Sequence, residues 1–371
     1  MNGYIMEKNV GKNRIKNTVI TFLSASSIIV CFPFLFCKGG NGNNPGYLPG
    51  NKVTYKIDNI KFRMIFVPGG KAFPSMPDDS ITKTVKNAYW IGETEVTFEL
   101  WKKVYDWALI NGYRFSNSGI IGDNGKRTNK HPVTMVSWRD AMVWCNALTE
   151  WYNAKNKTHD SCVYYIDERY TIPIRNSGNA VYRASINPKD GSFDKPYIMA
   201  KKSRNLDMSN CSATGFRLLT NDEWELAARY RGADKTNSVQ STIGGIDFGN
   251  PADGVYWTKA DCASGVIEDA IDFNSYNMVA WFGNSTVYGM GNTVSTRPVA
   301  EKTANGLGIY DMSGNVLEWC FDCDLFSVRH DRIERGGCWA SDANQIKVGF
   351  CFSYYPYGVS NDLGFRFAKN L

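Results

Sequence analysis

The C-terminal segment, residues 332–371, constrains the fold most, because two framework-like ends enclose a middle that has no hydrophobic period. At its start, Gly336 and Gly337 precede Trp339, which suits a strand that passes closely under another backbone. At its end, apolar residues alternate with glycine and arginine over 363–367, which predicts a half-buried strand. Both ends therefore have the character of fixed scaffold.

The middle of this segment, residues 340–362, combines tyrosine and phenylalanine with serine, glycine and asparagine. Rigid aromatic side chains supply contact area and small polar ones supply adaptable hydrogen bonds, which is the composition of a paratope. A long, partly buried loop over the core is the alternative interpretation. Composition alone leaves both interpretations open.

The size and charge of the chain limit the classes of protein that it can represent. Its 371 residues are enough for one large domain or two ordinary ones. Hydrophobic residues at 43%, with 11 Trp, 20 Tyr and 20 Phe, exclude global disorder. The formal charge is +6, and four basic residues against one acidic residue lie within 1–37. The remainder lacks the concentrated basic face that nucleic acid requires, so we expect no nucleic-acid partner.

Residues 1–37 have the pattern of an export leader, in which a basic stretch precedes an uncharged apolar run. The run ends at Cys37, and a tether rich in Gly, Asn and Pro follows over 38–58. This arrangement is typical of a lipoprotein, so we expect lipidation of Cys37 and a membrane-anchored protein exported to the outer surface. Cys31 is a second candidate acceptor, and an uncleaved membrane-spanning leader is the alternative anchor.

The eight remaining cysteines could pair in an exported protein, but their spacings fix no connectivity. Cys320 and Cys323 form a lone CxxC pair, without a second pair or a βαβ setting. Buried thiols are therefore expected, rather than a redox or zinc site.

Regular structure is predicted at four places. The run 61–67 indicates a buried strand. Thr97, Ser137 and Thr220 each stand where an N-cap would begin a helix, and the last two have an acidic residue three positions later, the capping-box pattern. The polar stretches between these places contain neither a phosphate-binding glycine loop nor an internal repeat, so a doubly wound α/β fold is not expected.

A set of short motifs lies in order along most of the chain, and together they are specific. They are FVPGG (66–70), EVT (95–97), HPV (131–133), VSW (136–138), FRLLT (216–220), EWELA (223–227), GLGIYDMSGNVLEW (306–319), RGG (335–337) and LGFR (363–366). In this order the chain resembles the formylglycine-generating-enzyme, or sulfatase-modifying-factor, branch of the C-type lectin fold. The resemblance implies one α+β domain over 59–371, with few short helices and strands and much irregular structure. It also implies a surface made by a C-terminal variable region, about 332–371.

The resemblance does not extend to the catalytic cysteines of the enzyme branch. That family oxidises a substrate cysteine with two cysteines of its own, and the corresponding positions here hold Ser341 and Ile346. Neither side chain can supply the thiolate that copper and redox exchange require. We therefore expect no enzyme activity.

A second branch is more similar, the variable proteins of diversity-generating retroelements, of the treponemal lipoprotein kind. Their C-terminal region begins near an Arg-Gly-Gly-x-Trp element and closes with a Gly-Phe-Arg strand, as here. Mutagenic reverse transcription diversifies residues of that region on a fixed scaffold, which here would include Ala343, Val348 and Pro356. The exposed ligand-binding set that this resemblance implies is Ala340, Ser341, Asp342, Asn344, Gln345, Phe350, Phe352, Ser353, Tyr354, Tyr355, Tyr357, Gly358, Ser360 and Asn361.

The enzyme branch can also hold calcium in the loop that corresponds to residues 311–318. By resemblance, the ligands of a structural calcium would be Asp311, Gly314, Val316 and Glu318, an oxygen-rich set that suits a hard cation. The alternative is that the two carboxylates bond backbone groups and brace the loop. No cofactor is required in either case.

Together these features predict a surface-displayed receptor or adhesin that binds an unknown protein or cell-surface ligand through its C-terminal segment. Trp339 is expected to be framework, so its loss should unfold the domain. The alternative function is an exported formylglycine-generating-enzyme-like oxidoreductase, or another enzyme with an unrecognised site.

Overall fold

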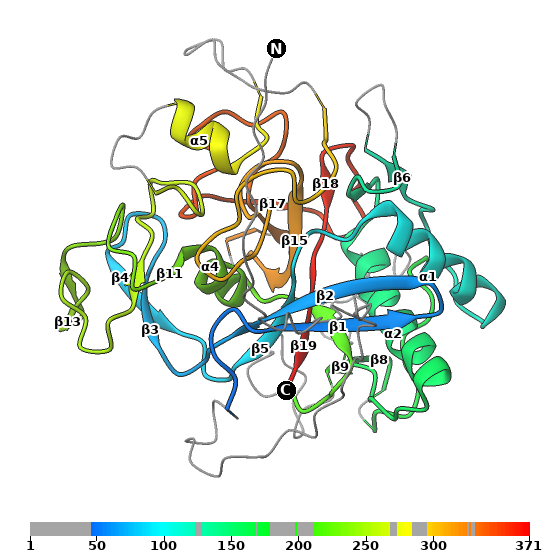
Figure 1. Cartoon of the computed structure of the whole chain (residues 1–371). Coiled ribbons are helices and arrows are strands. Elements are labelled where there is room, and N and C mark those ends of the chain that lie inside the picture. Colours follow the sequence, from blue (N-terminus) through cyan, green and yellow to red (C-terminus); the bar gives the residue numbers. More distant parts are fainter. Residues whose placement is uncertain are drawn as a thin grey trace, which may run out of the picture. The chain divides into compact units, whose positions relative to one another are not determined.

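The computed structural model describes residues 46–122, 128–167, 169–178, 197–198, 211–267, 273–283, 295–324, 326–327 and 331–371 (Figure 1). These residues belong to a unit that extends from Gly39 to Leu371. The predicted leader with Cys37 lies outside the described residues. Within them, no helix is both long enough and apolar enough to cross a membrane.

A five-stranded antiparallel sheet has the strand order β1-β2-β5-β19-β10, so the C-terminal strand lies between two earlier ones (Figure 1). The apolar run predicted as a strand over 61–67 is confirmed. It is continuous because both faces of this sheet are covered: Met64 and Phe66 enter one core, and Ile65 and Val67 enter another. The strands are β1 (Lys52–Ile57), β2 (Ile60–Val67), β5 (Tyr89–Gly92), β10 (Phe216–Leu218) and β19 (Phe367–Asn370).

Helices α1 (Phe98–Ile110) and α2 (Trp138–Asn156) pack against each other and contribute to the first core. Both predicted starts are confirmed. The side chain of Thr97 accepts a hydrogen bond from the Leu100 amide, and Ser137 forms a capping box with the residue three positions later. Helix α4 (Asn221–Arg229) also begins with the predicted capping box and faces the second core.

A four-stranded sheet with the order β17-β16-β15-β18 carries the C-terminal segment. Strands β15, β16 and β17 are antiparallel neighbours, whereas β18 lies parallel to β15. Strand β17 is therefore an edge strand. The bounds are β15 (Leu317–Cys323), β16 (Arg332–Arg335), β17 (Cys351–Tyr354) and β18 (Leu363–Gly364).

The remaining described elements are short, and much of the chain between them is irregular, as predicted. They are helix α5 (Phe273–Val279) and five antiparallel pairs: β3 (Ala72–Ser75) with β4 (Ile81–Thr84), β6 (Ile120–Ile121) with β7 (Val133–Thr134), β8 (Tyr164–Tyr165) with β9 (Tyr197–Ile198), β11 (Tyr230–Gly232) with β14 (Tyr256–Trp257), and β12 (Thr242–Ile243) with β13 (Ile246–Asp247).

Two predictions about the ends of the domain are wrong. The expected tether over 38–58 contains β1, which pairs with β2 along its whole length. Before β1, the ring of Tyr47 already lies 5.0 Å from that of Trp90. Residues 52–57 alternate in side-chain character and pair with β2 as a strand. The Gly- and Asn-rich residues before them led to the prediction of a flexible tether over the whole range.

The predicted half-buried strand over 363–367 is instead divided between β18 and β19, and it is buried throughout. Alternation suggested that Arg366 would face solvent. The structure places its guanidinium inside, in an ion pair with Glu318 at 2.6 Å. The alternation of apolar and charged residues therefore does not show whether the charged side chain faces solvent or a buried ion-pair partner.

Candidate ligand-binding surface

Three adjacent strands place Trp319, Glu334 and Phe352 side by side. Glu334 on β16 is opposite Trp319 of β15 and opposite Phe352 of β17. Residues directly opposed in antiparallel strands point to the same face of a sheet, so the three side chains share one face. Tyr354 shares it as well, because its ring stacks on that of Trp319 with 6.4 Å between centroids.

The turn after β16 requires both of its glycines. Gly336 and Gly337 have φ angles of 92° and 68°, a region that other residues rarely adopt. A Cβ on Gly337 would stand 2.7 Å from the carbonyl oxygen of Gln345, so the predicted close approach of another backbone is confirmed. The turn is closed by Ser341, whose Oγ accepts a hydrogen bond of 3.0 Å from the Cys338 amide.

Three tyrosines form a continuous aromatic surface at the end of β17 and beyond it. The rings of Tyr354 and Tyr355 are 4.0 Å apart, and those of Tyr355 and Tyr357 are 4.8 Å apart. The hydroxyls of Tyr354 and Tyr355 form a hydrogen bond of 2.7 Å, which raises the pKa of Tyr354 to about 12. The guanidinium of Arg139, from α2, lies 5.4 Å from the Tyr357 ring centre. Helix α2 thus supports one end of this surface.

The predicted ligand-binding set divides by exposure, and two of its members are wrong as exposed residues. Ser341 is buried because it closes the turn. Gly358 is buried because a Cβ there would stand 2.3 Å from the ring of Tyr354. The exposed members are Ala340, Asn344, Phe350, Tyr357 and Asn361. The half-buried members are Asp342, Gln345, Phe352, Ser353, Tyr354, Tyr355 and Ser360.

The predicted scaffold residues lie beneath this surface. Val348 and Pro356 are buried, and Ala343 is half-buried against a small core cluster. Trp339 is half-buried and packs on the main core, while its amide donates a hydrogen bond of 2.9 Å to the Asn315 carbonyl. Alternating buried and accessible positions therefore hold the segment in place and leave part of it available for contact.

The two positions that are cysteines in the enzyme branch have structural roles here. Ser341 closes the turn, and Ile346 is fully buried in a cluster with Val266 and Phe282. The nearest thiol in sequence, Cys338, hydrogen-bonds Ser341, and burial raises its pKa to about 12. A thiol with so high a pKa is a poor nucleophile at neutral pH.

None of the eight cysteines in the described ranges forms a disulfide. The CxxC residues Cys320 and Cys323 are both buried, which is the state predicted for them. Burial raises the pKa of Cys320 well above its usual value. Only Cys211 and Cys351 are half-buried.

The loop proposed to bind calcium is braced by protein contacts. Both carboxylate oxygens of Glu318 accept hydrogen bonds from Arg366, and Oε2 also accepts one of 2.8 Å from Trp224. The positively charged guanidinium of Arg366, hydrogen-bonded to both oxygens, would repel a second cation at Glu318. Glu318 therefore does not fit a calcium ligand set. Oδ2 of Asp311 accepts from the Ala300 amide at 2.7 Å. Within the described residues, no group of three or more His, Cys, Asp or Glu side chains could hold a metal ion.

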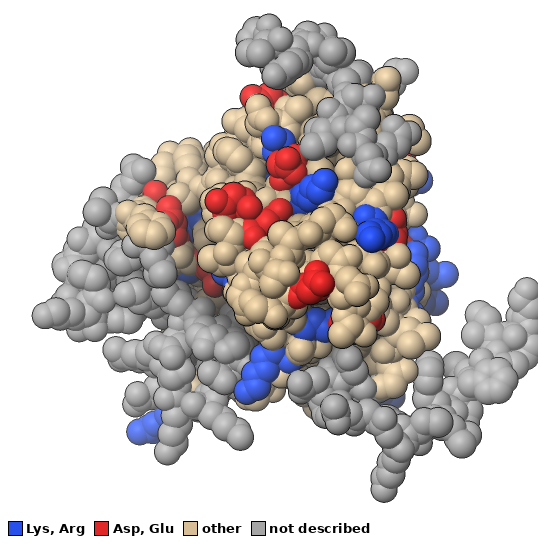
Figure 2. Space-filling view, turned by 90° about the vertical axis from the view of Figure 1, so that its left-hand side faces the viewer, with Lys and Arg blue, Asp and Glu red and all other residues tan. Residues whose placement is uncertain are grey.

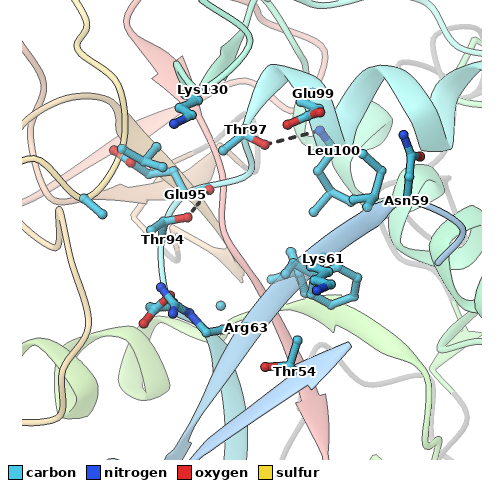
Figure 3. A pocket seen from close by; sticks show the side chains of 17 residues that line it. Thr54, Asn59, Lys61, Arg63, Thr94, Glu95, Thr97, Glu99, Leu100 and Lys130 are labelled. Atoms are coloured by element: carbon cyan, nitrogen blue, oxygen red, sulfur yellow. Dashed lines mark hydrogen bonds and ion pairs between the residues drawn. The ribbon is translucent and has the colours of Figure 1, made fainter. Parts of the chain in front are cut away.

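A cavity of about 590 Å³ lies between the β1–β2 hairpin and the start of α1 (Figure 3). Figure 3 shows Lys61 and Arg63 on one side of it and Glu95 and Lys130 on another. Burial, followed by the charges of neighbouring carboxylates, raises the pKa of Glu95 well above its usual value. The described residues that line it include neither cysteine nor histidine.

Charges of both signs are interspersed on the face seen in Figure 2. Two ion pairs illustrate this mixing: Lys71 of the β2–β3 connection pairs with Asp253, and Lys83 of β4 pairs with Asp222 of α4 at 2.6 Å. The described residues seen on this face therefore form no extended basic patch for a polyanion.

Sequence reasoning missed three buried residues that lie beneath the candidate surface: Trp319, Glu334 and Arg139. Each lies outside the segment 340–362, on a strand or helix that the segment packs against. Glu334 could have been found from the strand period. In residues 332–335, successive side chains point to opposite faces of the sheet, so Glu334 shares a face with Phe352 and Tyr354 of the neighbouring strand.

Comparisons with known proteins agree with this geometry. Residues 58–371 match the family described as sulfatase-modifying factor enzyme 1-like domains. Chaperone protein LppX of Paenibacillus barcinonensis is 28% identical over 313 residues, which cover 83% of this chain and 89% of that protein.

Two solved structures are similar over nearly their whole length. Treponema denticola variable protein 1 is 26% identical, with a TM-score of 0.56 over 86% of this chain and 99% of that one. CarF is 25% identical, with a TM-score of 0.57 over 85% of this chain and 99% of that one. The predicted α+β fold of the formylglycine-generating-enzyme type is confirmed, and the chain belongs to the family of sulfatase-modifying factor enzyme 1-like domains.

Proposed function

We propose that this protein is a non-enzymatic ligand-binding protein of the receptor or adhesin kind, whose partner is a protein or cell-surface ligand. The observation that carries the proposal is the contiguous aromatic surface of Tyr354, Tyr355 and Tyr357 at an edge strand above a buried sheet. Tyrosines held in this way lose little conformational entropy on binding and are typical anchors of an interface. The structural roles of Ser341 and Ile346 support the absence of oxidase chemistry.

We also propose that the protein is exported, anchored through a lipid on Cys37, and diversified by a retroelement in its C-terminal segment. The leader pattern and the similarity to Treponema denticola variable protein 1 support this. Sequencing of the gene and its flanks across many isolates tests it. Substitutions concentrated in codons 338–362, beside a constant near-copy and a reverse transcriptase gene, are expected. An even spread of substitutions would contradict diversification.

Binding through the aromatic surface is tested by comparing Tyr355→Ala with Trp339→Ala. Tyr355 is half-buried, and its ring packs on those of half-buried Tyr354 and exposed Tyr357. Its loss should therefore weaken binding by more than about 1 kcal/mol and leave the melting temperature nearly unchanged. Trp339 packs on the core, so its loss should lower the melting temperature first. Equal losses of stability in both variants would assign the tyrosines to the core instead.

A chaperone role is a second candidate, because a protein named Chaperone protein LppX is similar over most of this chain. The same aromatic surface would then hold apolar segments of unfolded chains. The two functions separate in a light-scattering assay with thermally unfolding citrate synthase. A chaperone suppresses its aggregation at stoichiometric amounts and loses this effect with Tyr355→Ala, whereas a specific receptor has no effect.

A further inference from the structure

The carboxyl group of Glu334 lies beneath the aromatic surface, and one of its oxygens has no partner in the described part of the chain. Glu334 is 5% exposed, and its Oε1 atom has no hydrogen-bond partner among the described residues. Trp319 and Phe352 flank it on the neighbouring strands, and Tyr354 lies two residues from Phe352 on the same face. Nearly all buried polar groups in proteins have a hydrogen-bond partner, so an unpartnered carboxyl oxygen indicates a site where a ligand group could bind.

The surroundings of Glu334 are acidic. Burial, and then the charges of Asp362 and Asp331, raise its pKa to about 8. The two arginines of its own strand are turned to other partners. Arg332 donates to the Phe321 carbonyl and lies 3.9 Å from the Trp138 ring centre, and Arg335 pairs with Glu225 at 3.3 Å.

We propose that Glu334 and the rings of Phe352 and Tyr354 form a subsite for a cation, the ammonium or guanidinium of a lysine or arginine side chain in a protein ligand. The subsite rests on the proposed binding function and specifies its partner chemistry. A ligand cation would supply the missing partner of Oε1 and would also be attracted by the aromatic faces. Access is from the edge of the sheet, because β17 is its edge strand and its side chains are half-buried.

The position of Glu334 in the sequence gives the subsite a further property. It lies before the turn at Gly336 and Gly337, outside the set predicted to vary, while Phe352 and Tyr354 lie within that set. A constant acid would therefore select basic ligands in every variant, while the residues around it adjust shape. Diversification would change which basic epitope is bound, and the requirement for a cation would remain.

The experiment uses a phage-displayed library of random 12-residue peptides, selected on the intact protein at pH 8. Peptides that bind the native protein and are lost on Tyr355→Ala define ligands of the surface. These peptides are expected to contain an excess of Lys and Arg over the unselected library. Glu334→Gln should weaken their binding at least tenfold, whereas Glu301→Gln, the same change at an exposed position, should have no effect.

A pH series separates a charge effect from a change of shape. Affinity should rise from pH 6 to pH 9 as the Glu334 carboxyl ionises, and Glu334→Gln should abolish this rise. The charged groups near Glu334 are Asp331, Asp362 and Arg332. The pKa of Tyr354 and that of Cys338 are both raised to about 12, above the range of the series.

The outcomes distinguish the subsite from the proposed function. Surface-dependent peptides without a basic excess, bound equally by Glu334→Gln, would overturn the subsite and leave the binding function intact. If no selected peptide is lost on Tyr355→Ala, both the function and the subsite fail. Basic surface-dependent peptides that lose affinity with Glu334→Gln but not with Glu301→Gln, and that show the stated pH dependence, establish the subsite.

Discussion

Two buried glutamates show how a single partner decides the behaviour of a carboxyl group. Glu318 has an arginine and an indole as partners and braces the centre of the fold. Glu334 lies on the adjacent strand with aromatic and acidic neighbours. Burial removes water from both carboxyl groups, which is unfavourable for a charge. Within the described part of the chain, hydrogen bonds and an ion pair compensate for this loss at Glu318 and not at Oε1 of Glu334. The first is therefore structural, and the second is available to a ligand.

The isolated position of Glu334 predicts how stability depends on pH. Its pKa rises from 4.5 in the unfolded chain to about 8 in the folded protein, so folding favours the protonated form. This contribution is fully present below about pH 4.5 and is lost progressively as pH rises from there through about 8, by up to roughly 5 kcal/mol. Glu334→Gln should therefore be more stable than the native protein at pH 9 and similar at pH 5 in urea unfolding. Parallel pH curves for both proteins would show that Glu334 is solvated.

For the ion pair between Arg366 and Glu318, removal of one partner should destabilise the protein, whereas Glu334→Gln should stabilise it at high pH. Arg366→Met should destabilise the domain by about 3–5 kcal/mol, because it leaves a buried carboxylate without its charge partner. The double variant with Glu318→Gln should recover part of that loss, since the uncompensated charge is gone. Urea unfolding of the native protein, both single variants and the double variant measures the coupling. Additive losses would mean that the two groups do not interact.

At the scale of elements, the starts of helices were predictable because a cap is a local event. Thr97, Ser137 and Thr220 each satisfy an amide within three residues, so the signal is contained in four positions. The division of 363–367 between two sheets was not predictable, because it depends on β15 and β5, which are distant in sequence. For the same reason the sequence could locate the aromatic segment of the site but not the glutamate beneath it.

The turn after β16 predicts a large effect from a small substitution. Gly337→Ala adds a Cβ at a positive φ and 2.7 Å from a carbonyl oxygen, so both strain and collision oppose it. Gly112→Ala is the matched control, because its φ is 85° and nothing lies within 4 Å of the new Cβ. The control should lose about 1 kcal/mol of stability and Gly337→Ala at least about 2 kcal/mol more, measured by thermal unfolding. Equal losses would mean that the turn relaxes freely.

At the scale of the whole molecule, the binding segment is fixed at both ends. It leaves from β16, and it returns through β18 to β19, which lies between two strands of the large sheet. A segment anchored in this way can change its accessible side chains without losing its path. The fold thus separates the residues that maintain structure from those that make contact, which is the requirement of a diversified receptor.

This separation predicts that the exposed set can be replaced together. Simultaneous substitution of Ala340, Asn344, Phe350, Tyr357 and Asn361 by serine should shift the melting temperature by only a few degrees, because exposed side chains each contribute about 0.5 kcal/mol or less. Gly358→Ala alone, at a buried position, should cost more than all five, because the new Cβ collides with the Tyr354 ring. Circular dichroism melting curves of the two variants test the order. If the fivefold variant is the less stable of the two, the exposed side chains also stabilise the fold. Substitutions for binding would then be constrained by stability, which would contradict the proposed separation of structural and contact residues.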